Sequence, residues 1–517
     1  MKLFLPNTLS SGMVLQRNTK VNLWGLADKT VTIRFLGRCY TAEPDAAGRW
    51  LITLDNLPPG GPHVMHIGDE ELQDVYIGDV WLCGGQSNMQ WTMSSVRYMF
   101  PEDMQAVNPA LRQFAVPQQM DFHAPIDDLR HGEWNGVSPD TIADFSAVGY
   151  FFSKHLHQRY GVPIGLILAA IGGTPIHAWM SRSALTAFPE TIKEADRCTD
   201  DDYIARLRDK DAASTAAFYK AIDQTDPGLV QKWYAKDYDD DAWEARSLLQ
   251  PWSGACSVWY RQTVTIPPSL AGKSAALFLG TVMDADIVYF NGKLIGKTED
   301  RYTQRTYFIP ELPEGRCTIA IRVLSKNGGG FTTGKQYMLS TDAGSIDLSG
   351  IWQFHPGGVT EPPPQETLLH NMPTGLYNGM IHPLRKHTIR GAIWYQGETD
   401  AFYPGRYAEK FAAMARLWRN DWGYDFPLLF VELAHWSEGQ CWDELRRQQR
   451  LALHVPGTAM AAAFDLGEHN DVHPQDKRTV GERLARCAIR MAYNEKLPPS
   501  PFEIIAAQHD MGALLEN

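Results

Sequence analysis

A residue suited to nucleophilic chemistry stands where an apolar segment ends. The stretch VWLCGGQSNMQW places Ser87 behind an apolar run and two glycines. A serine hydroxyl is a poor nucleophile unless a base, usually a histidine, lies within hydrogen-bond reach. His473, in the stretch NDVHP near the end of the chain, is a residue of the right type. This pair predicts acyl transfer with a serine nucleophile and a histidine base.

Acyl transfer also needs hydrogen-bond donors for the oxyanion that forms when serine attacks an ester carbonyl. The sequence offers donors of the right type in the backbone amide of Ser87, the amide of Gly172 or Gly173, and the side-chain amide of Gln396. Pro474 suits the first turn of a helix. The positive end of that helix would help to keep the preceding histidine neutral, as a base must be.

Each of these residues also has an ordinary structural explanation. A lone serine after a strand is commonly a helix N-cap, and Gly172-Gly173 is also the composition of a tight turn. Four other polar residues are equally explained as loop, cap or surface positions: Gln396, Glu398, Asp400 and His473. The catalytic interpretation is favoured because these stretches all follow predicted strands, where an open parallel sheet binds its ligands.

Alternating strand and helix patterns predict a mostly parallel sheet that is covered on both faces. Apolar runs predict five buried strands, within residues 74–83, 162–173, 390–400, 427–433 and 458–467. Amphipathic patterns predict helices at 145–161, 407–423, 442–455 and 475–493, the first of them closed by Gly161. The sheet would bring the candidate residues to one edge.

Two further regions have the short strands and turn clusters of β-structure. Residues 14–77 predict a small antiparallel sandwich. After a polar helical stretch at about 186–224, residues from about 243 to 354 contain strands with Asn-Gly and Glu-Gly turns, which predict an inserted β-sandwich or jelly roll. We therefore expect four segments: an N-terminal β-sandwich (1–74), a first part of the α/β domain (75–225), the insert (226–356) and a second part (357–517).

The composition narrows the class of partner. The 517 residues carry a formal charge of −12 without runs of Lys or Arg, which disfavours nucleic acid. No window predicts a transmembrane helix, so no membrane partner is expected. The seven scattered cysteines lack the spacing of a zinc site or a disulfide framework. The apolar stretch before Pro6 is too short for a signal peptide, so we expect a cytoplasmic protein, or a periplasmic or secreted one if a leader had been removed.

Aromatic and polar residues near the proposed edge are candidates for substrate binding. Tryptophan faces stack on sugar rings, although core packing accounts for most of the sixteen tryptophans. The residues that we expect to contact substrate are Gln86, Asn88, Trp91, Trp179, Trp394 and Glu398.

Five strings occur in a fixed order along the chain: GGQSNM, IGGTPIHAW, LYNGMIHPL, RGAIWYQGETD and NDVHP. Together they resemble the sialate O-acetylesterase family of the SGNH hydrolase superfamily, and the likeness includes GMVLQ near the start and the strings WYR and FNG in the insert. The resemblance implies an α/β fold with a flavodoxin-like, three-layer α/β/α SGNH hydrolase domain. The insert would be a galactose-binding-like sandwich.

The resemblance also implies an activity. Such a protein is a serine carboxylic ester hydrolase, without metal or other cofactor, that removes O-acetyl groups from carbohydrate, above all the 9-O-acetyl group of sialic acid. Carried over by position, Ser87 is the nucleophile and His473 the base, and the amides of Ser87 and Gly173 with the Gln396 side chain form the oxyanion hole.

One position departs from the pattern of the family. The aspartate that usually precedes the histidine by three residues is Asn470 here, and Asp471 stands two residues before His473. Asp471, Asn470 or a backbone carbonyl would orient the histidine.

Two other functions remain open at this stage. An esterase for acetylated xylan or another plant glycan would share the catalytic strings. A non-catalytic carbohydrate-binding protein could use the same scaffold, although the intact Ser87, His473 and Gln396 disfavour it.

Overall fold

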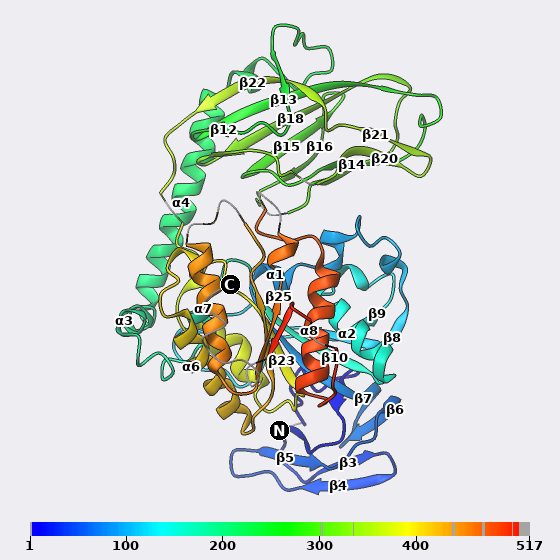
Figure 1. Cartoon of the computed structure of the whole chain (residues 1–517), viewed down its shortest axis with the longest axis vertical. Helices are drawn as coiled ribbons and strands as arrows, with labels where there is room; N and C mark the ends of the chain where they lie inside the picture. The colour runs from blue at the N-terminus through cyan, green and yellow to red at the C-terminus, as the bar shows by residue number, and fades with distance from the viewer. Residues whose placement is uncertain are drawn as a thin grey trace. The chain divides into compact units, whose positions relative to one another are not determined.

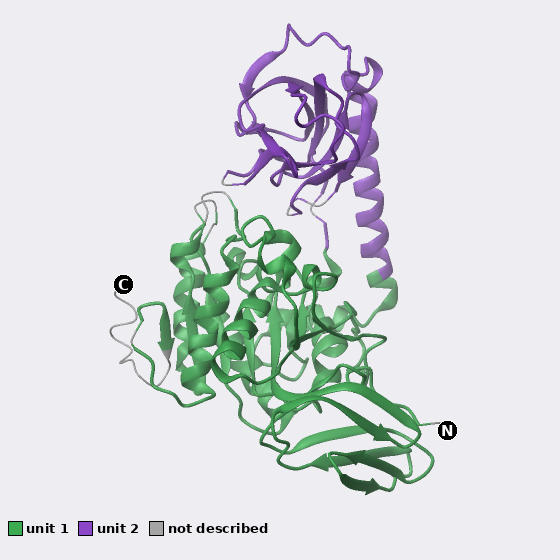
Figure 2. Ribbon diagram, turned by 90° about the vertical axis from the view of Figure 1, so that its right-hand side faces the viewer, with its two compact units in different colours: residues 1–204, 368–517 green, residues 205–367 purple. Residues whose placement is uncertain are grey.

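The computed structural model describes residues 3–299, 301, 303–333, 335–364, 366–436, 439, 441–467, 471–498 and 500–505. The chain forms two compact units (Figure 2). Unit 1 contains Met1–Ile204 and Leu368–Asn517, and unit 2 contains Ala205–Thr367. The segments of unit 1 that carry the candidate site residues are thus brought together from the two ends of the chain.

A parallel sheet forms the centre of unit 1. Its strand order is β26-β25-β24-β23-β7-β10-β8-β9. The parallel strands are β7 (Glu70–Gly85), β8 (Asn108–Ala115), β10 (Ile164–Ala170), β23 (Gly391–Tyr395), β24 (Leu428–Glu432) and β25 (Thr458–Ala462). Antiparallel strands β9 (Trp134–Val137) and β26 (Glu503–Ile505) flank them. The five predicted strands are confirmed, and β8 adds a sixth parallel strand.

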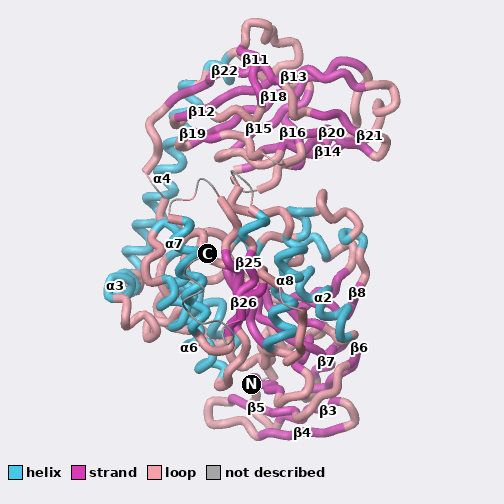
Figure 3. Tube along the Cα trace, viewed as in Figure 1, coloured by secondary structure: helices cyan, strands magenta, loops and turns pink. Residues whose placement is uncertain are grey.

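Strands β10, β23, β24 and β25 are buried along their whole length because helices cover the sheet. Helix α2 (Ala147–Tyr160) packs against α8 (Lys477–Met491), and α6 (Tyr407–Trp422) packs against α7 (Trp442–Leu451). The two pairs lie on opposite sides of the strands (Figures 1 and 3). Ser146 Oγ accepts from the Gly149 amide at 3.1 Å to begin α2, and Gly161, at φ 64°, ends it. The four predicted helices are confirmed.

Part of the N-terminal β-structure joins the same sheet through β7, and the rest forms a separate two-stranded sheet. The N-terminal strands are β1 (Val14–Gln16), β2 (Val21–Leu26), β3 (Val31–Phe35), β4 (Arg38–Ala42), β5 (Arg49–Leu54) and β6 (Gly60–Ile67). Strand β2 pairs with β5, whereas β1 and β6 pair with the first half of β7. The second half of β7 pairs with β10 and β23. The N-terminal strands and the parallel sheet therefore share one continuous strand.

Unit 2 contains two antiparallel sheets. One has the order β11-β22-β13-β18-β15-β16 and the other β17-β14-β20-β21. The strands are β11 (Glu244–Ser247), β13 (Cys256–Ile266), β14 (Ala275–Leu279), β15 (Ala285–Phe290), β16 (Lys293–Thr298), β17 (Thr306–Ile309), β18 (Gly315–Ser325), β20 (Tyr337–Thr341), β21 (Gly344–Asp347) and β22 (Ile351–Val359), with a short β12–β19 pair (Trp252–Ser253, Gly328–Gly329). Apolar side chains of both sheets form one core. The predicted Asn-Gly turn joins β15 to β16, with positive φ at Asn291 and Gly292.

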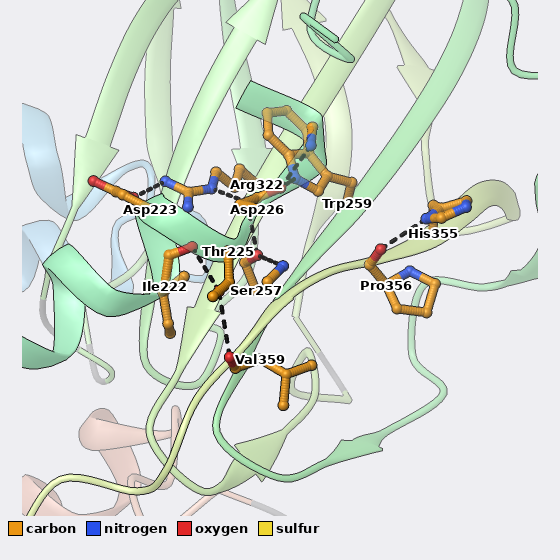
Figure 4. Close-up of polar contacts among 12 residues, drawn as sticks. Ile222, Asp223, Thr225, Asp226, Ser257, Trp259, Arg322, His355, Pro356 and Val359 are labelled. Atoms are coloured by element: carbon orange, nitrogen blue, oxygen red, sulfur yellow. Dashed lines mark hydrogen bonds and ion pairs between the residues drawn. The ribbon is translucent and has the colours of Figure 1, made fainter. Parts of the chain in front are cut away.

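A buried carboxylate joins the helical segment of unit 2 to its larger sheet. The polar stretch after β10 forms α3 (Pro189–Arg197), α4 (Asp201–Thr225) and α5 (Pro227–Val230). Asp226, between α4 and α5, accepts from Ser257 Oγ at 2.7 Å and from Arg322 Nε at 2.7 Å (Figure 4). Trp259 Nε1 adds a donor at 3.1 Å. The carboxylate is thus fully hydrogen-bonded, as a buried charge must be.

The structure also bears on the sequence expectations about membrane-spanning helices, cysteines and metal sites. Among the described residues, no helix combines the length and the apolar character that crossing a bilayer requires. The seven cysteines, all within the described ranges, are free thiols. No cluster of three or more metal-ligating side chains occurs in the part of the chain that the structure describes.

Candidate active site

Ser87 lies at the carboxyl end of the sheet because of a close approach between two strands. It is the first residue of α1 (Ser87–Gln90), directly after β7. Gly85 has φ 141°, and a Cβ there would lie 2.1 Å from the carbonyl oxygen of Tyr395 on β23. Only glycine fits this position. The Gly-Gly pair therefore lets the chain pass against β23 and turn Ser87 onto the edge of the sheet.

The Ser87 hydroxyl meets the imidazole of His473. Ser87 Oγ lies 2.9 Å from His473 Nε2, although the residues are 386 positions apart. Gln86, not Ser87, is the N-cap residue of α1, and it makes no side-chain cap bond. The helix-cap alternative for Ser87 is therefore wrong, and its hydroxyl is placed as a base-activated nucleophile requires.

Asp471 contacts the other side of the same imidazole. Its Oδ1 lies 3.2 Å from His473 Nδ1 and accepts from the His473 amide at 2.9 Å. A proton on Nδ1 directed at this carboxylate leaves Nε2 free to accept from Ser87. Asn470, the second of the three alternatives, lies outside the described residues.

The helix that follows His473 begins later than expected. Helix α8 starts at Lys477, and Asp476 Oδ1 accepts from the Thr479 amide at 3.0 Å as its cap. The prediction that Pro474 stands in the first helical turn is therefore wrong, because Asp476 offers a better cap two residues further on.

The ring of Trp91 stacks on the His473 imidazole, with centroids 4.5 Å apart and planes at 15°.

Two backbone amides at this edge are available to an oxyanion. Within the described ranges, the amides of Ser87 and Gly173 donate to no other group. The Gly172 amide instead donates to Gln90 Oε1 at 2.7 Å. A Cβ on Gly172 would lie 3.3 Å from Ser87 Cβ, so this turn packs directly against the serine. The geometry favours Gly173 over Gly172 as the donor.

The Gln396 side chain is not available to an oxyanion, contrary to the sequence prediction. It is completely buried. Its Nε2 donates to Asp400 Oδ2 at 2.7 Å and to the Thr174 carbonyl at 3.1 Å, and its Oε1 accepts from the Tyr407 hydroxyl at 3.0 Å. Both amide protons are therefore used inside the protein. Gln396 links the end of β23 to the turn after β10.

Three further polar residues support the site from within instead of contacting substrate as predicted. Gln86, Asn88 and Glu398 are all buried. Gln86 Oε1 accepts from the Gly397 amide at 3.2 Å. Asn88 Nδ2 donates to Glu398 Oε1 and, at 3.0 Å, to the Val472 carbonyl. Burial raises the pKa of Glu398. These side chains connect strand ends and are covered, so a sugar cannot reach them.

The predicted tryptophan contacts are also corrected in part. Trp179 and Trp394 are at most 1 % exposed and pack edge to face against each other. Trp179 Nε1 donates to Thr174 Oγ1 at 3.0 Å. They are core residues, since both rings are enclosed by other side chains. Trp91 remains half-buried beside His473.

Sequence inspection missed two residues of this region. Lys477 is completely buried, and its ammonium donates to Asn88 Oδ1. His370 is half-buried, and its Nε2 lies 3.9 Å from the position that a Cβ on Gly173 would occupy. Burial lowers the pKa of His370, and among the described residues its ring has no hydrogen-bond partner. The sequence pattern does not distinguish either residue from an ordinary surface residue.

Comparison with known proteins identifies a family and several relatives that this chain resembles. The family described as carbohydrate esterase, sialic acid-specific acetylesterase, matches residues 77–207 and 351–490. The chain is 24 % identical to the sialate O-acetylesterase of Mus musculus over 534 residues, which covers 94 % of this chain and 72 % of that protein. Its identity to the sialate O-acetylesterase of Homo sapiens is 32 % over 213 residues, or 35 % of this chain and 39 % of that protein.

A solved structure extends the likeness to the fold. A carbohydrate acetylesterase from Xanthomonas citri is 26 % identical, with a TM-score of 0.59 over 96 % of this chain and 77 % of that one. The family match covers the segments that contain Ser87, Gly173 and His473. The chain therefore belongs to the carbohydrate esterase family of sialic acid-specific acetylesterases and is a carboxylic ester hydrolase.

Proposed function

We propose that this enzyme is a serine esterase that removes O-acetyl groups from carbohydrates, with 9-O-acetylated sialic acid as its substrate. The observation that carries the proposal is the 2.9 Å contact between Ser87 Oγ and His473 Nε2, beside a Gly173 amide that donates to no other group among the described residues. The names of the related proteins support the choice of substrate.

In the first half of the reaction Ser87 Oγ attacks the acetyl carbonyl carbon while His473 Nε2 takes the hydroxyl proton. The carbonyl oxygen becomes an oxyanion, which the amides of Ser87 and Gly173 stabilise. When the tetrahedral intermediate collapses, the bond to the sugar oxygen breaks and His473 returns its proton to that oxygen. The products are the free sugar hydroxyl and an acetyl-Ser87 ester.

In the second half a water molecule replaces the sugar. His473 Nε2 takes one of its protons as the water oxygen attacks the acetyl carbon, and the same amides hold the second oxyanion. Collapse releases acetate and returns the proton to Ser87 Oγ. Asp471 would keep the imidazole in the required orientation throughout both halves.

The architecture that we propose follows the family resemblance. The α/β part would be a flavodoxin-like, three-layer SGNH hydrolase domain made of segments 75–225 and 357–517. An N-terminal β-sandwich (1–74) and an inserted galactose-binding-like sandwich (226–356) would complete the chain. The helix pairs on the two sides of the sheet and the shared core of the two unit 2 sheets support this division.

The nucleophile is tested with Ser87→Ala and, as control, Ser95→Ala, a nearby half-buried serine outside the proposed mechanism. We expect Ser87→Ala to lower kcat for acetyl-ester hydrolysis by about 10⁴-fold or more, with an unchanged circular dichroism spectrum. Ser95→Ala should keep wild-type activity. Hydrolysis that survives in Ser87→Ala would overturn the mechanism. Failure of the wild-type serine to react with a fluorophosphonate would favour a non-catalytic carbohydrate-binding protein.

The substrate class is tested by acetate release. Wild-type enzyme is incubated separately with 9-O-acetylated sialic acid and with acetylated xylan at matched acetyl concentration. We expect a higher kcat/KM on the sialic acid. A higher value on xylan would keep the serine mechanism and replace the substrate.

A further inference from the structure

The first residue of α8 places a positive charge inside the protein, next to the proposed catalytic pair. Lys477 is completely buried, and its ammonium donates to Asn88 Oδ1. The same nitrogen lies 5.3 Å from the ring centre of Trp91 and 5.6 Å from that of Tyr395. A buried ammonium is unfavourable unless hydrogen bonds and polarisable groups replace water. These contacts supply that environment.

The lysine determines the orientation of Asn88. An ammonium has donors only, so the side-chain oxygen of Asn88 must face Lys477 and its Nδ2 must donate. That Nδ2 donates to Glu398 Oε1 and to the Val472 carbonyl at 3.0 Å. Asn88 follows the proposed nucleophile in sequence, and Val472 precedes the proposed base. The amide thus ties together two segments that are 384 residues apart.

A second connection runs through Trp91. Its ring stacks on the imidazole of His473 at 4.5 Å, and the Lys477 ammonium lies near the same ring. The imidazole of His473 therefore stacks on a ring that the Lys477 ammonium also contacts.

We propose that Lys477 is a positioning residue for the Ser87–His473 pair, acting through Asn88 on their separation and through its charge on the imidazole. The inference rests on the proposed function, because it assigns a role within that reaction. It concerns a group that neither accepts a proton nor touches the ester.

The positive charge of Lys477 acts in one direction on the protonation of the His473 imidazole. The two ring separations place the ammonium within about 10 Å of the imidazole, close enough in a buried site for a substantial Coulomb interaction. Three other titratable groups lie close to the imidazole, Asn88 or the ammonium: Asp471 beside the imidazole, Glu398 beyond Asn88, and Tyr395 beside the ammonium. A nearby cation disfavours a protonated imidazole. Lys477 therefore extends the activity of a histidine base towards lower pH.

The test compares two substitutions of Lys477 with a matched control. Lys477→Gln removes the charge but keeps a donor for Asn88, and Lys477→Met removes both. Arg483→Met removes another buried cation of α8, one that pairs with Asp465 at 2.6 Å. For each variant, the rate of Ser87 modification by a fluorophosphonate is measured between pH 4 and 9, together with kcat and KM for 4-nitrophenyl acetate.

We expect the acidic limb of the modification rate to move up by about 0.5–1 pH unit in both Lys477 variants. Lys477→Met should also lower kcat by about 10-fold or more, with a smaller change in KM, because Asn88 loses its orientation. Arg483→Met should lower thermal stability and leave the limb in place. Lys477→Gln alone decides the question if Lys477→Met does not fold.

An unmoved acidic limb in Lys477→Gln, or an equal movement in Arg483→Met, would overturn the inference. Failure of the proposed function would give a different result. Ser87 of the wild-type enzyme would then not be modified by the fluorophosphonate at any pH. The two failures are therefore separate results of one experiment.

Discussion

The Trp91 ring lies flat on the imidazole of His473, with 4.5 Å between centroids and 15° between planes. Trp91 follows α1, which begins at the proposed nucleophile, so one short segment carries both the serine and the surface that supports its base. Stacking restricts rotation of the imidazole while leaving both ring nitrogens at its edge for Ser87 and Asp471.

Replacing Trp91 should allow the His473 imidazole to rotate more freely while leaving the base in place. We expect Trp91→Leu to lower kcat about 3- to 10-fold, a factor that corresponds to the energy of one stacked aromatic pair. Tyr160→Leu is the control, since Tyr160 stacks on Tyr493 at 4.1 Å and 13° in unit 1 but away from this site. Steady-state kinetics of both variants would contradict the assignment if they lost equal activity.

The Gly173 amide can be tested through its backbone conformation. Alanine at a φ of 76° is strained by about 1–2 kcal/mol. Gly161→Ala is matched, because Gly161 has φ 64° and its Cβ would meet open space at the end of α2. We expect similar losses of unfolding free energy in both variants, but a fall in kcat of up to about 100-fold only in Gly173→Ala. Equal kcat values would remove Gly173 from the oxyanion hole.

Asp471 should matter less than the histidine that it contacts. We expect Asp471→Asn to lower kcat, but by at least about 10-fold less than His473→Ala does, because an orienting carboxylate contributes less than the base. Asp476→Asn is the control, since asparagine also caps a helix and α8 should be preserved. Wild-type kcat in Asp471→Asn would assign the orienting role to another group.

His370 borders the Gly173 turn with a ring that has no partner within the described residues. We expect it to hydrogen-bond the bound substrate, so His370→Ala should raise KM about 5- to 10-fold with little change in kcat, which is the value of one hydrogen bond. The exposed His131→Ala is the control. A fall in kcat at constant KM would show that His370 does not act through ground-state binding.

Two buried histidines predict how stability depends on pH. Burial lowers the pKa of His177 and of His387 to about 4. Below pH 6.5 the unfolded chain takes up protons that the folded protein does not, so the free energy of unfolding should decrease as pH falls from 6.5 towards 4. Each group contributes up to about 1.4 kcal/mol per pH unit in this window.

Urea unfolding at pH 7, 6 and 5 measures this dependence. His387→Gln should reduce the change in the free energy of unfolding per pH unit. His454→Gln, at an exposed position, should not. An unchanged slope in His387→Gln would show that acid destabilisation arises elsewhere.

The sequence predicted the parallel strands well because their burial on both faces leaves uninterrupted apolar runs, as in β10 and β24. Strand β8 was missed because it carries buried polar side chains. Gln113, 4 % exposed, accepts from the Ser146 amide at 2.9 Å and so looks like a loop residue in the sequence. Tertiary hydrogen bonds of this kind are invisible to periodicity.

The sequence predicted the two central residues of the candidate site but not the surroundings of the other strand-end side chains. The rule that ligands bind beyond the strand ends brought Ser87 and His473 together. It could not tell which strand-end side chains face solvent, so Gln396 was predicted as an oxyanion donor and Trp394 as a substrate contact although both are buried. Lys477 escaped notice because a lysine at a helix start is normally exposed.

Strand β7 has a consequence for self-association. Its residues 70–77 pair with β6 on one edge, and residues 76–78 pair with β1 on the other. Without these two strands, the first half of β7, the strand that leads to the proposed nucleophile, would present a row of unpaired backbone groups as a template for intermolecular β-pairing. By pairing with β7, strands β1 and β6 cover backbone groups that would otherwise be open to such pairing.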